Sequence, residues 1–149
     1  MHILVDGDAC PVISECEDAA VDFNAKLIIY TDLAHQISSE IGQVIYTDTA
    51  KQSVDMLIYS ECKANDIVIT QDYGLAALVL GKKAIVLNHY GNCYNNKNID
   101  QLLMLRHLNA KARRAGNKHP TYSKRTDEDN KNFKKELYLQ LRKYNKDDL

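Results

Sequence analysis

Acidic residues placed just after short apolar segments are the features of this 149-residue chain that could do chemistry. Asp6 and Asp8 follow the first apolar segment, Asp72 follows the fourth and Asn88 follows the fifth. If these segments are parallel strands, their carboxyl ends meet at one edge of a sheet, where ligands collect. Carboxylates gathered there repel one another unless a cation lies among them. Oxygen ligands of this kind suit Mg²⁺ or Mn²⁺.

A further carboxylate, Asp55, lies near the start of a helical pattern that precedes the fourth apolar segment. Each acidic residue also has a simpler explanation. Asp55 would interact favourably with a helix dipole, Asp8 could cap the helix that opens near Pro11, and Asp72 could begin a turn. Composition and spacing alone therefore leave two interpretations open, a metal site or ordinary turn and cap chemistry.

The elements that must position these residues alternate along the first part of the chain. Short β-branched segments at residues 2–5, 26–30, 43–46, 67–70 and 84–87 read as strands, and helical patterns cover residues 11–23, 52–63 and 75–80. Apolar strands separated by helices predict a three-layer α/β/α fold around a parallel sheet buried on both faces. We expect residues 1–112 to form this domain. Residues 113–149 should form a basic loop and a last helix, at 128–144, packed on the same domain.

Charge is distributed unevenly along the chain. Residues 1–110 hold 7 Lys and Arg against 14 Asp and Glu, whereas residues 111–149 hold 12 against 6. A cationic stretch could draw a polyanion toward an acidic site, because phosphate contacts depend on charge and not on base sequence. A solvated basic loop is an equally good explanation. The residues expected to bind nucleic acid are Lys111, Arg113, Arg114, Lys118, Lys124 and Arg125.

Composition argues against several other classes of protein. No apolar segment approaches the length of a membrane span, and the first residues lack the pattern of an export signal. We therefore expect a cytoplasmic protein with no membrane partner. The four cysteines show no zinc-binding spacing and should be free thiols.

Several motifs resemble those of one family. Residues 6–11, Asp-Gly-Asp-Ala-Cys-Pro, are similar to the opening motif of the YaiI/YqxD family of uncharacterised bacterial proteins, and residues 66–76 are similar to a second motif of that family. The resemblance covers nearly the whole chain. It also includes Val54-Asp55, Asn88 with Gly91, Arg106, and residues 111–114 with Gly116.

The family in turn looks like a branch of the PIN-like superfamily, whose members are metal-dependent nucleases. The resemblance implies a five-stranded sheet of order 3-2-1-4-5 and Mg²⁺ or Mn²⁺ held by Asp6, Asp55 and Asp72. It implies a further acidic residue earlier in the chain, a role that Asp8, Glu15 or Glu40 could fill, and we choose Asp8 as an outer ligand or base. Thr70 would then support Asp72, and Asn88 would orient a carboxylate or touch substrate. The expected activity is phosphodiester hydrolysis, with RNA favoured as substrate.

Two other functions fit parts of the same pattern. Haloacid-dehalogenase-like phosphatases also carry Asp-x-Asp after their first strand, as in Asp6-Gly7-Asp8, but Asn88 and His89 stand where that class needs acidic residues. The chain is also short for that fold. The second alternative is a PIN-like module that binds RNA or a protein partner without turnover.

Overall fold

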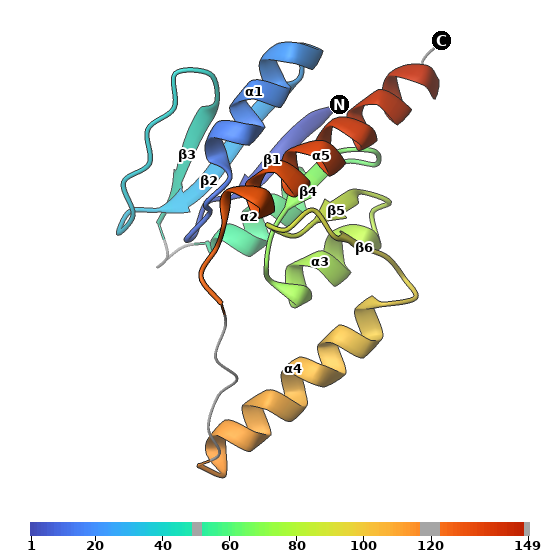
Figure 1. Cartoon of the computed structure of the whole chain (residues 1–149). Helices are drawn as coiled ribbons and strands as arrows, with labels where there is room; N and C mark the ends of the chain where they lie inside the picture. The colour runs from blue at the N-terminus through green and yellow to red at the C-terminus, as the bar shows by residue number, and fades with distance from the viewer. Residues whose placement is uncertain (49–51, 117–122, 148–149) are drawn as a thin grey trace.

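A computed structural model describes residues 1–48, 52–116 and 123–147. Helices separate most of the strands in the first 90 residues, as predicted, but the second strand is followed directly by the third (Figure 1). The strands are β1 (His2–Asp6), β2 (Lys26–Asp32), β3 (Gln43–Thr47), β4 (Ile67–Ile69), β5 (Ile85–Leu87) and β6 (Cys93–Tyr94). The helices are α1 (Ile13–Phe23), α2 (Val54–Glu61), α3 (Tyr73–Leu80), α4 (Ile99–Arg114) and α5 (Asp127–Asp147).

The strands form one sheet in the order β3-β2-β1-β4-β5-β6. The first five are parallel to one another, so the predicted order 3-2-1-4-5 is confirmed. The prediction of five strands was incomplete, because β6 pairs antiparallel with β5 at the edge. A strand of two residues has no periodicity that the sequence could reveal. It arises where the chain turns back, with Asn88 N donating to Asn92 O at 3.0 Å.

The sheet is the middle of three layers. Alternate residues of β1 point to opposite faces, as the pleat requires. Ile3 and Val5 belong to the core shared with α1 and α5, and Leu4 belongs to the core shared with α2 and α3. Figure 1 shows α1 and α5 on the nearer face of the sheet and α2 and α3 behind it. Both faces are therefore covered over the central strands, which explains why Ile3–Val5 of β1 and Ile67–Ile69 of β4 are apolar and buried.

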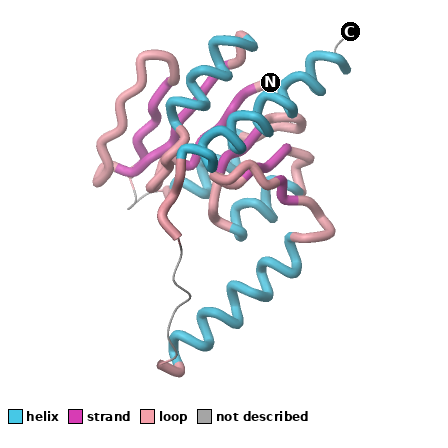
Figure 2. Tube along the Cα trace, viewed as in Figure 1, coloured by secondary structure: helices cyan, strands magenta, loops and turns pink. Residues whose placement is uncertain are grey.

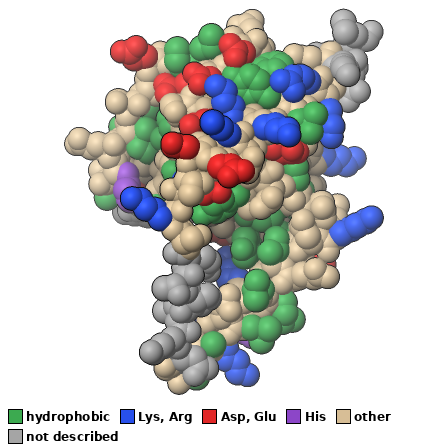
Figure 3. Space-filling view, in the orientation of Figure 1, with side chains coloured by type: hydrophobic (Ala, Val, Ile, Leu, Met, Phe, Trp, Pro, Cys, Tyr) green, Lys and Arg blue, Asp and Glu red, His purple; other side chains and the backbone are tan. Residues whose placement is uncertain are grey.

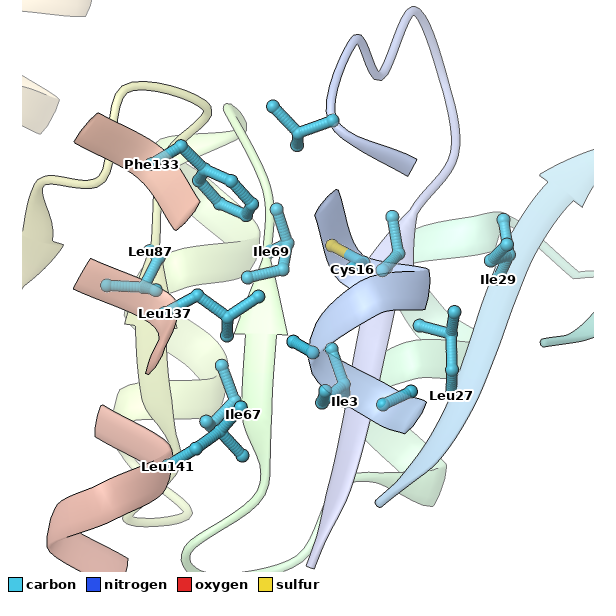
Figure 4. Close-up of a cluster of buried hydrophobic side chains, with 14 residues drawn as sticks. Ile3, Cys16, Leu27, Ile29, Ile67, Ile69, Leu87, Phe133, Leu137 and Leu141 are labelled. Atoms are coloured by element: carbon cyan, nitrogen blue, oxygen red, sulfur yellow. The ribbon is translucent and has the colours of Figure 1, made fainter. Parts of the chain in front are cut away.

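Helix α5 completes one of these layers. Its Phe133, Leu137 and Leu141 recur every four residues, so they share one face, and all three are almost fully buried. Figure 4 shows them over Leu87 and Ile67 of the sheet. On the flank of α5, the ring of Tyr138 meets that of Phe23 edge to face, with centroids 5.3 Å apart.

Helix α4 extends away from the layers (Figure 2). Ile99 in its first turn is buried, whereas most of its later residues are exposed. The helix begins at Ile99, because residues 95–98 form an Asn-rich turn in which Asn95 Oδ1 accepts from Asn98 N at 2.8 Å. Within the described ranges, no helix is both long enough and apolar enough to span a membrane.

Candidate functional site

A hollow of about 460 Å³ opens at the carboxyl ends of β1, β2 and β4. The four aspartates singled out from the sequence lie together in its wall, although they come from three separate segments of the chain. Strand order explains this meeting, because β1 and β4 are neighbours at the point where the chain changes direction across the sheet. The residues that line the hollow are Asp6, Asp8, Thr31, Asp32, Ser53, Val54, Asp55, Gln71 and Asp72.

Asp6 ends β1 and is held in place by the neighbouring strand. Val5 pairs with Ile69, the last residue of β4. Thr70, which follows Ile69, therefore lies beside Asp6. The Thr70 hydroxyl donates to Asp6 Oδ2 at 3.0 Å. Burial raises the pKa of Asp6, and the charges of nearby carboxylates add to the effect. The ionised form of Asp6 is therefore costly in this hollow.

Asp72 caps the helix that follows β4. Its Oδ1 accepts from Gly74 N at 2.8 Å and Leu75 N at 3.2 Å. Arg106 of α4 also reaches this oxygen, at 3.3 Å. Asp72 therefore does cap this helix, as the alternative interpretation held, but the capping hydrogen bonds use only its Oδ1. Because the three donors converge on Oδ1, Oδ2 retains capacity for a further partner.

Asp55 lies in the first turn of α2, one helix away from Asp72 in sequence. Ser53 caps this helix by accepting from Met56 N at 3.2 Å, which leaves Asp55 on the rim of the hollow. Burial, the charge of Asp72 and a hydrogen bond between the two carboxyls raise the pKa of Asp55 to about 6. Asp55 therefore holds a proton more tightly than an ordinary aspartate.

Asp8 lies across the hollow in a different setting. Its Oδ1 is 3.5 Å from Nε2 of His35, whose Nδ1 lies 2.7 Å from Asp32 Oδ1. The hydrogen bond to Asp32 raises the pKa of His35. The suggestion that Asp8 caps the first helix was wrong, since Val12 occupies the cap position of α1 and makes no side-chain cap hydrogen bond.

Asp32 and Arg106, which bring charge to this site, were not assigned to it from the sequence. Asp32 ends β2 and faces the same hollow, so the strand-end argument that selected Asp6 applies to it as well. It was missed because the second strand was expected to end at residue 30, before the polar pair Thr31 and Asp32. Arg106 is 34 residues from Asp72, and no local pattern in the sequence predicts that contact.

The two residues predicted to support the site have different surroundings. Thr70 is fully buried, donates to Asp6 and accepts from Asp72 N at 3.0 Å, so it joins the two strand ends. Asn88 lines a neighbouring hollow instead. Its Oδ1 accepts from Tyr90 N and Asn92 N, both at 2.9 Å, which shapes the turn after β5.

The predicted basic stretch is divided between separate places. Lys111, Arg113 and Arg114 form the exposed last turn of α4. Arg125, in contrast, holds the turn after β5, because its guanidinium donates to His89 O at 2.5 Å and covers the ring of Tyr90. Lys124 is exposed, and Lys118 lies outside the described residues.

The donors around the hollow are all oxygens, the type that Mg²⁺ and Mn²⁺ prefer. As the side chains stand, no three His, Cys, Asp or Glu residues within 1–48, 52–116 and 123–147 are grouped in a way that could hold a metal ion. The site is thus a group of carboxylates around a cavity, and not a closed set of ligands.

Comparison with known proteins places the chain among bacterial relatives. Residues 4–143 match the family described as "Uncharacterized BCR, YaiI/YqxD family". A UPF0178 protein of Clostridium novyi is 50% identical over 130 residues, 87% of each chain. One from Clostridium tetani is 47% identical over 98% of this chain and 100% of its own length. No solved structure shows significant similarity to the chain. The length and strength of these matches show that the chain belongs to the YaiI/YqxD family.

Proposed function

We propose that this protein is a metal-dependent nuclease that hydrolyses phosphodiester bonds, with RNA as the favoured substrate. The observation that carries the proposal is the meeting of Asp6, Asp8, Asp55 and Asp72 in one hollow, where burial and the charge of Asp72 raise the pKa of Asp55 to about 6. Four carboxylates that repel one another around a cavity are unfavourable for folding alone. Binding of a divalent cation turns the same arrangement into a favourable one.

The donor set fits Mg²⁺ or Mn²⁺ in chemistry and in charge. Asp6, Asp55 and Asp72 would hold the ion, and hydrogen bonds from Thr70 and from the first turn of α3 already orient Asp6 and Asp72. Such positioning of ligands by neighbouring groups is usual at metal sites. When bound, the ion would neutralise charge on the phosphate and acidify a water molecule.

The remaining residues of the hollow have roles that follow from their contacts. The Asp8 carboxylate is 71% exposed and faces the hollow, so it is suited to accept a proton from an attacking water. His35, 3.5 Å from Asp8, would pass that proton on to solvent. Arg106 lies beside Asp72 with its side chain 56% exposed, where it could contact a substrate phosphate.

Substrate must approach this acidic hollow despite its own negative charge. The exposed Lys111, Arg113 and Arg114 at the end of α4 supply positive charge outside the hollow, and Arg106 supplies it at the rim. Contacts of this kind give salt-sensitive binding without base specificity. The preference for RNA rests on the resemblance to PIN-like nucleases.

The test is cleavage of labelled single-stranded RNA by the purified protein with Mn²⁺ and with EDTA. We expect cleavage with Mn²⁺ only, and a loss of at least a hundredfold in Asp6→Asn and in Asp72→Asn. Glu40→Gln is the matched control, because Glu40 is an exposed carboxylate outside the hollow. RNA binding without cleavage by the wild type would favour the non-catalytic module, and cleavage that survives both Asp substitutions would overturn the proposal.

A further inference from the structure

Helix α4 carries apolar residues on two opposite faces. Ile99, Leu102 and Leu103 point to the body of the protein, where they pack with the core that contains α3. Arg106 shares this inner side and reaches Asp72. On the other side, Met104, Leu105 and Leu108 are 58%, 49% and 53% exposed. Their spacing of three and four residues places them on one continuous stripe.

This outer stripe has no cover within the described part of the chain. Helix α4 packs against α3 at its first half and then leaves the body, as Figure 1 shows. Figure 3 shows hydrophobic side chains gathered along this lower part of the molecule. A helix that contacts solvent on its outer side normally has polar residues there. A helix that is apolar on both sides is typical of one packed between two partners.

The charges on α4 indicate what that partner is. Asp100 is in the first turn, and Lys111, Arg113 and Arg114 are in the last turn. If two copies of α4 lie antiparallel, the acidic start of each meets the basic end of the other. Parallel pairing would instead set the two basic ends side by side, which is unfavourable. Asp100 and Lys111 also lie on the same flank of the stripe at 100° per residue, as antiparallel contact requires.

We propose that the outer face of α4 is the interface of an antiparallel homodimer in which Met104 of each copy packs against the partner's Leu108. In that arrangement Asp100 of each copy lies beside the partner's Lys111, in its basic last turn. The inner face, with Arg106 on Asp72, is left unchanged. The proposal is independent of any metal or nuclease activity.

The size of the interface sets the expected strength. Helix α4 has 16 residues, a length of about 24 Å. One helix pair of this length covers less than the roughly 800 Å² per partner of a standard stable interface. We therefore expect a dimer that dissociates on dilution, so the measured mass should depend on protein concentration.

Sedimentation equilibrium of the metal-free protein from low micromolar to near-millimolar concentration tests the interface. The wild type should move from the 16.9 kDa of one chain toward twice that mass. Leu108→Glu should remain at one chain throughout, with unchanged circular dichroism because Leu108 is exposed. Leu139→Glu, at an exposed leucine of α5, is the matched control and should dimerise as the wild type does.

A charge exchange tests the antiparallel orientation. Asp100→Lys should weaken association at least tenfold, since both ends of the pair then carry like charges. Adding Lys111→Glu and Arg114→Glu to that chain should restore it. A wild type that stays at one chain's mass at all concentrations would overturn the proposal, as would a Leu108→Glu variant that dimerises normally. An Asp100→Lys variant that associates with unchanged affinity would overturn the antiparallel orientation.

Discussion

Asp55, in the first turn of α2, and Asp72, which caps α3, line the same hollow, where burial and the charge of Asp72 raise the pKa of Asp55. Local sequence favours each residue separately, because Asp55 lies in the first turn of α2 and Asp72 caps α3. Their repulsion arises only when the fold brings the two helix starts together. Each of these residues therefore stabilises its own helix start. Together, their negative charges lower the stability of the folded protein when no cation is bound.

Replacing Asp55 by Asn should stabilise the metal-free protein. The pKa of Asp55 is about 6 in the folded state, above its ordinary 3.8, so the folded protein holds the proton more tightly than the unfolded chain. Stability is therefore lost as the pH rises from 3.8 to about 6, because the unfolded chain releases this proton first. We expect Asp55→Asn to raise the free energy of unfolding by about 1 kcal/mol at neutral pH, less than the full shift would give, because solvent screens part of the repulsion.

Urea unfolding in EDTA measures this effect at several pH values. The gain should shrink as the pH falls from about 7 to about 4, because wild-type Asp55 becomes protonated in the folded state over that range. Glu40→Gln, in an exposed carboxylate, should change stability little at any pH. A destabilising Asp55→Asn substitution at neutral pH would show that the pair is favourable without metal.

Thr70 joins Asp6 and Asp72 through a single buried hydroxyl. Thr70→Val removes that hydroxyl but keeps the shape, leaving Asp6 Oδ2 and Asp72 N without this partner. We expect a loss of about 1–3 kcal/mol of stability and of about tenfold or more in Mn²⁺ affinity. Thr70→Ser keeps the hydroxyl and should retain most of the affinity. Equal affinities in calorimetry for the Val and Ser variants would contradict a role of the hydroxyl in positioning the carboxylates.

Among the elements, α5 shows how a helix from the end of the chain contributes to the core. Leu137 is fully buried against the sheet, whereas Leu139, two residues along the same helix, is 40% exposed. We expect Leu137→Ala to lower the free energy of unfolding by about 2–5 kcal/mol through lost burial and a cavity. Leu139→Ala should cost well under half as much. Similar losses in urea unfolding would mean that α5 does not pack as described.

The sequence predicted the main elements because apolar strands and amphipathic helices leave clear patterns. What it could not supply depends on tertiary contacts or on very short segments. β2 continues to Asp32 because Thr31 and Asp32 pair with β3, a pairing that no local pattern shows. β6 has only two residues. The same limit applies at the site, since strand ends predicted the gathering of Asp6 and Asp72 but not the contact of Arg106 with Asp72.

At the scale of the whole molecule, the acidic hollow at the strand ends and the basic last turn of α4 are two separate charged surfaces. If RNA binds through the last turn of α4, changing Lys111, Arg113 and Arg114 to Gln should reduce the dependence of log affinity on log salt by about 2, since each phosphate contact on a single strand contributes about 0.7. Fluorescence anisotropy on the Asp72→Asn background, where cleavage should be absent, measures this slope.

Three exposed lysines of α5 serve as the matched control for this experiment. Lys131, Lys135 and Lys143 carry the same total charge on a different surface. Changing them to Gln should alter the salt slope much less than the α4 substitutions. If both sets of substitutions lower the slope equally, attraction of RNA comes from net charge and not from a binding surface at α4.

Binding of Mn²⁺ measured by calorimetry on the wild type, Asp6→Asn and Glu40→Gln tests the metal site most directly. We expect the wild type and Glu40→Gln to bind with similar affinity at neutral pH and more weakly at pH 5, where Asp55 is protonated. Asp6→Asn should bind at least tenfold more weakly. If the wild type binds no Mn²⁺, or if Asp6→Asn binds as tightly as the wild type, the hollow at the strand ends is not a metal site.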